Sequence, residues 1–154
     1  MKSILSIFLL IFISSCGFKI VSVSEQNNFS VIDLSSNGDK RVNYIIRNKI
    51  LDSSKKNSVN RIIIDLNTNK TKTVKEKNIR NEITKYEISI TANIKFGKEE
   101  NIKQFNFIKT NKNDYDVNKQ YSQTRNNEKK LTELLSENLA DEIITEISKR
   151  MNDI

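Results

Sequence analysis

The sequence predicts an α+β fold: a two-layer sandwich in which a mainly antiparallel sheet of about four strands carries two helices on one face. Three observations predict it. Residues 86–96 alternate strictly between apolar and polar side chains, which is typical of a half-buried strand. Residues 40–51 and 127–151 instead repeat apolar side chains at the spacing of amphipathic helices. The segments follow the order strand, helix, three strands, helix.

The first half of the domain is expected to contain two strands and one helix. A strand is predicted from Phe29 to about Leu34, and residues 35–39 predict a turn that ends in Asp39 as the helix cap. The helix over residues 40–51 has one apolar stripe to bury. The β-branched run over residues 61–66 then predicts a strand that continues into an exposed polar extension ending near Lys77.

The second half is expected to contain a hairpin and a long helix. Residues 97–101 predict the loop between the alternating strand and a returning strand over residues 102–108. Phe105 and Phe107 on that returning strand are expected in the core rather than on a lipid-facing surface. The helix over residues 127–151 carries an apolar stripe that includes Leu131, Leu135 and Ile143.

The N-terminus has the features of an export signal. Lys2 precedes an unbroken apolar run over residues 4–13, which is too short for the roughly 20 residues of a transmembrane helix. The tetrad Ile13-Ser14-Ser15-Cys16 follows and resembles a bacterial lipobox. An ordinary secretory signal or an uncut anchor is the alternative.

The lipobox resemblance predicts three segments. They are a signal peptide (1–15), a lipidated tether (16–28) and a periplasmic α+β domain (29–154). Cys16 would carry a diacylglyceryl thioether and an acylated amine, with palmitate as a typical acyl group, and several buried chains hold a protein stably to a membrane. Gly17 follows the cysteine where aspartate commonly marks inner-membrane retention, so we expect the outer membrane.

Composition excludes several kinds of chemistry. The chain has no histidine, one cysteine, no proline and three glycines, so metal sites, histidine-based catalysis, intramolecular disulfides and phosphate-cradling loops are disfavoured, and no cofactor is expected. The formal charge is +7 and becomes +6 when Lys2 leaves with the signal. This excess is spread along the chain and suits either an anionic partner or a genome-wide bias. The export signal argues against nucleic-acid binding.

With this order of elements, the chain resembles the LptE family of lipopolysaccharide-assembly lipoproteins over nearly its whole length. The residues that carry the resemblance are Cys16-Gly17-Phe18, Tyr115-Asp116, Gln120-Tyr121-Ser122 and the segment from Leu134 to Ile147. The chain departs from many relatives at Lys19-Ile20, where they have proline or leucine, and at Ser122, where they have alanine.

The resemblance implies a lipid-anchored protein on the periplasmic face of the outer membrane and no enzymatic activity. It implies that the chain binds and plugs the LptD β-barrel translocon and helps to assemble lipopolysaccharide in the outer leaflet. The runner-up is an accessory lipoprotein of an ABC-type lipid transport system. A periplasmic hydrolase using Asp33, Asp65 or a serine has less support, because no histidine is present to act as base.

Two groups of side chains are candidates for contacts with lipid A or with the barrel. Lysine and arginine form charge-assisted hydrogen bonds with phosphates, and an amphipathic tyrosine ring suits a wet interface. The candidates are Lys70, Lys72, Lys75, Lys77, Arg80, Tyr115 and Tyr121. The alternatives are that the cations form a solvated hairpin tip and that the tyrosines fold back onto the sheet.

Overall fold

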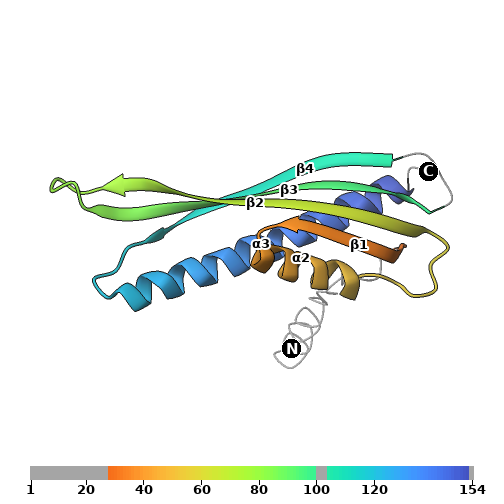
Figure 1. Cartoon of the computed structure of the whole chain (residues 1–154), viewed down its shortest axis with the longest axis horizontal. Helices are drawn as coiled ribbons and strands as arrows, with labels where there is room; N and C mark the ends of the chain where they lie inside the picture. The colour runs from red at the N-terminus through yellow and green to blue at the C-terminus, as the bar shows by residue number, and fades with distance from the viewer. Residues whose placement is uncertain (1–27, 100–103, 153–154) are drawn as a thin grey trace, which may run out of the picture.

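The computed structural model describes residues 28–99 and 104–152, which form one four-stranded sheet and two helices (Figure 1). In chain order the elements are β1 (Ser30–Gly38), α2 (Lys40–Asp52), β2 (Arg61–Lys77), β3 (Ile83–Lys98), β4 (Gln104–Asp116) and α3 (Tyr121–Asn152). Both helices lie on the same side of the sheet, so the predicted two-layer α+β fold is confirmed. The predicted signal peptide and nearly all of the predicted tether lie outside the described residues.

Neighbouring strands in the sequence are also neighbours in the sheet, which has the order β1-β2-β3-β4. β2 pairs antiparallel with β3, and β3 pairs antiparallel with β4. β1 and β2 pair in parallel, and a parallel pair needs a crossover connection, which α2 supplies. The sheet is therefore mixed, with the predicted antiparallel majority.

Alternation along the strands decides which face of the sheet is covered. On β2, Ile62, Ile64, Leu66 and Thr68 are buried while the residues between them are exposed. Leu66 pairs with Ile94 of β3, so the buried layer continues across the strands. Because side chains alternate between faces with a period of two, only one face is apolar, and both helices pack against it.

The hydrophobic core draws on all six elements. Phe107 is 9% exposed, and Phe105 is partly buried against this core, which confirms the expected position of both rings. Phe96 stacks on Phe105 with ring centroids 5.1 Å apart and meets Phe107 edge-on at 6.1 Å. These contacts close the end of the sandwich farthest from the β2–β3 hairpin.

The predicted cap of the first helix is confirmed. Asp39 precedes α2, and its Oδ1 accepts hydrogen bonds from the backbone N–H groups of Arg41 (3.1 Å) and Val42 (3.0 Å). These bonds satisfy donors that the first turn of a helix leaves unpaired. The buried side of α2 is formed by Val42, Ile46 and Ile50, at the spacing that the sequence predicts.

The turn predicted over residues 35–39 is wrong for residues 35–38, which continue β1. This segment, Ser35–Gly38, is polar, but each residue pairs with one of β2 from Asp65 to Thr68. Backbone pairing with β2 replaces the turn, since ladder hydrogen bonds do not depend on side-chain polarity. In the same way, the polar extension predicted after Leu66 belongs to β2 itself and pairs with β3.

The later boundaries also differ from the prediction. β4 runs to Asp116 rather than to Ile108, because every residue in that stretch pairs with one of β3. α3 begins at Tyr121 rather than Asn127. Its first turns are mostly exposed and polar, so they add no apolar repeat to the sequence pattern. In the described part of the chain, no helix is long and apolar enough to cross a membrane.

Gly38 lies at the end of β1, where it pairs closely with Thr68 of β2. Its φ is +105°, and a Cβ atom there would lie 1.8 Å from the carbonyl oxygen of Thr68. Gly38→Ala is therefore expected to lower the free energy of unfolding by at least about 2 kcal/mol, through strained backbone and steric overlap. Urea denaturation measures this, with Ser36→Ala as a control on the same strand. Equal stability of the two variants would contradict the expectation.

Candidate functional site

The candidate functional site lies at the open end of the sandwich, where the β2–β3 hairpin extends past the start of α3 (Figure 1). Aromatic and charged side chains from the sheet and from α3 meet there. We call this group the cation–tyrosine site, and its members are Lys72, Tyr86, Tyr115, Tyr121, Arg125 and Glu128.

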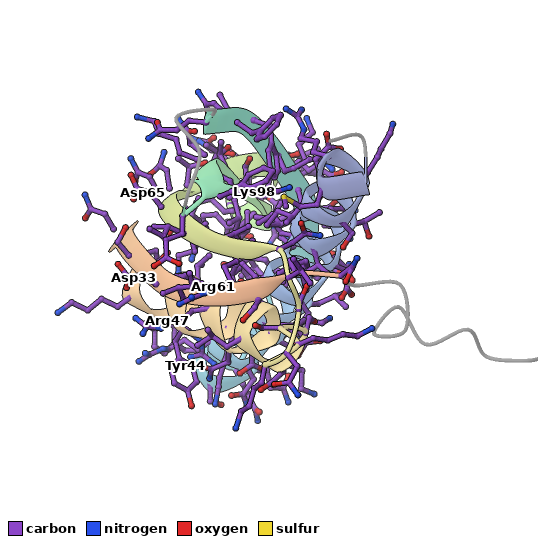
Figure 2. The ribbon with its side chains drawn as sticks, turned by 90° about the vertical axis from the view of Figure 1, so that its right-hand side faces the viewer. Asp33, Tyr44, Arg47, Arg61, Asp65 and Lys98 are labelled. Atoms are coloured by element: carbon purple, nitrogen blue, oxygen red, sulfur yellow. The ribbon has the colours of Figure 1, made fainter. Side chains whose placement is uncertain are left out.

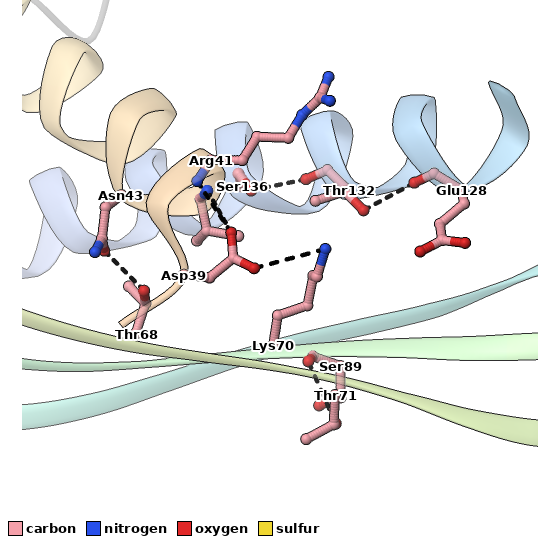
Figure 3. Close-up of polar contacts among 11 residues, drawn as sticks. Asp39, Arg41, Asn43, Thr68, Lys70, Thr71, Ser89, Glu128, Thr132 and Ser136 are labelled. Atoms are coloured by element: carbon pink, nitrogen blue, oxygen red, sulfur yellow. Dashed lines mark hydrogen bonds and ion pairs between the residues drawn. The ribbon is translucent and has the colours of Figure 1, made fainter. Parts of the chain in front are cut away.

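Strand alternation places the sheet side chains of the site. Lys70 and Lys72 continue the buried series of β2 by steps of two, so they project to the side of the helices. Lys70 reaches Asp39, the cap of α2, with Nζ and Oδ2 3.6 Å apart (Figure 3). Tyr86 and Tyr115 are directly paired on β3 and β4, and their rings stack at 5.9 Å.

Three side chains form the hydrogen-bonded centre of the site. Lys72 Nζ donates to Glu128 Oε2 at 2.7 Å, and the Tyr115 hydroxyl donates to the same oxygen at 3.0 Å. The Lys72 ammonium also lies 4.2 Å from the ring centroid of Tyr86 and 5.5 Å from that of Tyr115. This network ties the sheet to α3 at the edge of the apolar core, to which Tyr115 belongs.

The network fixes the charge states of its members. Partial burial disfavours the charged carboxylate, but the hydrogen bonds from Lys72 and Tyr115 outweigh it and lower the pKa of Glu128. Burial also opposes the charge of Lys72, yet hydrogen bonding to Glu128 and Tyr115 raises the pKa of Lys72. Burial, with the adjacent carboxylate, raises the pKa of Tyr115. At neutral pH the centre is a cation, an anion and a neutral phenol.

Two hollows flank Glu128. The larger has a volume of about 610 Å³ and lies between Lys72 and Tyr86 of the sheet and Tyr121, Arg125 and Glu128 of α3. The smaller has a volume of about 210 Å³ and is lined by Arg41, Lys70, Arg125, Glu128, Lys129 and Thr132. Arg125 lines both hollows, so a ligand that fills either one contacts this residue.

Three cations at these hollows are available to a ligand. Lys119 and Arg125 line the larger hollow, and Lys129 lines the smaller one. Among the described residues none of the three forms an ion pair, whereas Lys70 and Lys72 are paired with Asp39 and Glu128. Arg125 lies over the ring of Tyr121, which is 74% exposed, with 5.9 Å between Cζ and the centroid.

The sequence candidates separate into three places. Lys72, Tyr115 and Tyr121 come together at the cation–tyrosine site, and Lys70 lines the smaller hollow beside it. Tyr115 is only 7% exposed and packs in the core. Lys75 lies on the other face of the sheet and pairs with Asp114 at 2.7 Å.

The remaining candidates lie at the tip of the β2–β3 hairpin or outside the described residues. Lys77 and Arg80 lie at the hairpin tip, where Lys77 Nζ donates to Asn81 Oδ1 at 3.0 Å. Cys16 lies outside the described residues.

Sequence reasoning missed the members of the site that α3 supplies and one tyrosine of β3. Arg125 and Glu128 fall close to the predicted helix start, and Tyr86 belongs to the alternating strand. Strand alternation could have placed Tyr86 on the same face as Ile88. Only the tertiary structure brings Glu128 to Lys72, because the two are 56 residues apart in the chain.

The arrangement supplies cations, amphipathic rings and hydroxyl groups around open hollows. Such a set binds phosphates through charge-assisted hydrogen bonds and holds sugar or aliphatic surfaces against aromatic rings. Across residues 28–99 and 104–152, no group of three or more metal-ligating side chains is placed to hold a metal ion.

Comparison with known proteins gives fold likeness only. The chain matches no protein-family model and no curated protein sequence. Among solved structures, rare lipoprotein B from Shewanella oneidensis superposes with a TM-score of 0.60 at 14% identity, covering 79% of this chain and 97% of that one.

Two further lipoprotein structures share the fold. Uncharacterized lipoprotein B from Nitrosomonas europaea has a TM-score of 0.52 at 8% identity, covering 82% of this chain and 89% of that one. A protein from Caulobacter crescentus CB15, provisionally described as a lipoprotein, has a TM-score of 0.52 at 10% identity, covering 78% and 90%. The α+β sandwich of this chain is thus also the fold of lipoprotein domains.

The lowered pKa of Glu128 predicts an acid-dependent loss of stability. A carboxylate with a folded-state pKa below its unfolded value of about 4.3 stabilises the fold above that pH and loses this contribution as pH falls through the folded pKa. Glu128→Gln should therefore lower stability at pH 7 by about 1 kcal/mol and flatten its decline below about pH 5. Urea denaturation at several pH values tests this. Glu142→Gln, an exposed substitution on α3, should change neither quantity.

Proposed function

We propose that this chain is a lipoprotein of the outer membrane, anchored through acylated Cys16, that binds a large β-barrel translocon of the LptD type and helps to assemble lipopolysaccharide in the outer leaflet. Its part in this process is binding and scaffolding rather than catalysis. The periplasmic domain presents a binding site for lipid A phosphates at one end of the sandwich.

Fold and N-terminal sequence support the lipoprotein assignment. The sandwich is shared with rare lipoprotein B and two other lipoprotein structures. Ile13-Ser14-Ser15-Cys16 resembles a lipobox directly after an apolar run of signal-peptide length. The LptE-like order of elements leads from the lipoprotein class to lipopolysaccharide assembly.

The observation that carries the lipid-binding proposal is the pair of open hollows around Glu128. Lys119, Arg125 and Lys129 face them without an acidic partner among the described residues. Lipid A presents phosphates on a sugar backbone, so the cations fit its charges and Tyr121, which is mostly exposed, fits its sugar or chain surface.

The uncovered face of the sheet supports the barrel partner. It carries small polar side chains in cross-strand rows, such as Asn67 opposite Asn93 and Thr91 opposite Thr110. The Oγ1 atoms of Thr91 and Thr110 lie 3.0 Å apart. The face also exposes Ile63 and Ile108. A mainly polar face suits the wet inner wall of a barrel better than a hydrocarbon layer, because wet interfaces retain bridging water.

Affinity purification of the tagged full chain from membranes in mild detergent tests the anchor and the partner together. We expect the wild-type chain to be acylated and to co-purify in stoichiometric amount with a large outer-membrane β-barrel, as identified by mass spectrometry. Cys16→Ala should move the chain to the soluble fraction, since the anchor is lost. Recovery with inner-membrane ATPase and permease subunits would instead indicate the transport-accessory function.

Lipid A contact is tested by binding of purified lipopolysaccharide to the full chain. Arg125→Glu with Lys129→Glu should weaken binding by about tenfold, because two cations at the hollows become anions. Lys56→Glu with Lys112→Glu is the matched control, since both lysines are exposed and lie away from the hollows. Lipopolysaccharide stripped of its lipid A phosphates should bind the wild type as weakly as intact material binds the variant. Equal binding by all proteins would refute phosphate recognition at this site.

A further inference from the structure

A second open surface lies on another flank of the molecule, between strand β1 and helix α2. It is a hollow of about 320 Å³ that we call the β1–α2 groove, lined by Ser36, Asn37, Gly38, Lys40, Asn43, Tyr44 and Arg47. None of these residues lines the two hollows of the cation–tyrosine site. Figure 2 shows Tyr44 and Arg47 on α2 below the edge strand β1, on the same side of the molecule as Asp33.

The backbone of β1 is open along this groove. β1 is an edge strand of the sheet, with β2 on one side only. Its beginning is closed, because the Val31 N–H donates to Ser54 Oγ at 2.8 Å and the Lys55 N–H donates to the Phe29 carbonyl at 2.9 Å. From Asp33 to Asn37, no described element pairs with the outer side of the strand, and the Gly38 N–H donates to Asn37 Oδ1 at 2.8 Å. Edge strands with unpaired N–H and C=O groups are templates for another chain.

The charges of α2 separate according to the side of the helix on which they lie. Arg41 and Lys49, which face α3, form ion pairs with Glu133 at 2.5 Å and with Asp141 at 2.7 Å. Lys40 and Arg47 line the groove, and neither forms an ion pair with any residue in the described ranges. The unpaired cations of α2 therefore gather beside the open edge of β1.

Apolar and aromatic surface accompanies these cations. Tyr44 is 68% exposed and Leu51 is 39% exposed. Together with Lys40 and Arg47 they follow one another at steps of four, three and four residues, so all four lie on one stripe of α2. A strand added to the edge of β1 would direct every second side chain towards this stripe.

We propose that the β1–α2 groove binds an extended, acidic segment of a partner protein, which adds to the edge of β1 as a fifth strand. Main-chain hydrogen bonds to residues 33–37 hold the segment, Tyr44 and Leu51 receive its apolar side chains, and Lys40 and Arg47 pair with its carboxylates. Asp33 at the other end of the open edge repels acidic side chains, so the acids of the segment lie towards Gly38. This proposal does not depend on lipopolysaccharide binding.

The test uses the full chain in mild detergent and a short synthetic peptide in which valine and glutamate alternate. We expect binding to slow amide hydrogen exchange within residues 33–37. A peptide with glutamine in place of glutamate should bind at least about tenfold more weakly, because it lacks the carboxylates. Equal binding of the two peptides, no binding at all, or slower exchange along β4 instead of β1 would overturn the proposal.

Variants identify the groove residues. Lys40→Glu with Arg47→Glu should weaken acidic-peptide binding by at least about tenfold, and Tyr44→Ala should weaken it severalfold. Lys56→Glu with Lys112→Glu makes the same change in net charge away from the groove and should bind as the wild type does. Thermal unfolding shows whether each variant is folded.

The groove variants should keep wild-type lipopolysaccharide binding, which separates this proposal from the proposed function. Self-association through the groove without peptide would assign it to a second copy and refute the acidic partner.

Discussion

Two helices of unequal length cover the apolar face of the sheet. Their difference in length determines where the core ends and where polar side chains begin. At 1.5 Å per residue, the 13 residues of α2 extend about 20 Å and the 32 residues of α3 about 48 Å. The 17 residues of β2 extend about 56 Å. α2 therefore covers only the beginning of β2, α3 continues alone, and the β2–β3 hairpin extends past both.

Because the helices cover only part of β2, polar side chains follow the core residues along the same face of this strand. The buried series of β2 passes from Leu66 to Thr68, whose hydroxyl donates to Asn43 Oδ1 at 2.7 Å, and then to Lys70 and Lys72. Each of these side chains has a partner on a helix or at its N-cap, because a polar group that loses contact with water requires one. Where α2 no longer contributes, Glu128 of α3 supplies the partner, and the hollows open on either side of it.

The two surfaces with unpaired cations occur where this packing stops. One is the hairpin end, where Arg125 and Lys129 of α3 extend beyond the core. The other is the edge of the sheet, where β1 has no outer neighbour and α2 turns Arg47 away from α3. Because no residue lines both surfaces, the proposed lipid ligand and the proposed acidic segment would bind without competing.

Local patterns in the sequence were sufficient to predict the α+β class, the order of elements, the cap at Asp39 and the apolar face of each element, because periodicity of two or 3.6 residues is a local property. It could not determine the ends of β1 and β4, where polar residues are held by backbone pairing with a neighbouring strand. It drew attention to Lys72 and Tyr115 but not to Glu128, which joins them. The hydrogen bonds of Glu128 to Lys72 and Tyr115 follow from the packing of α3, because they depend on how far α3 extends along the sheet.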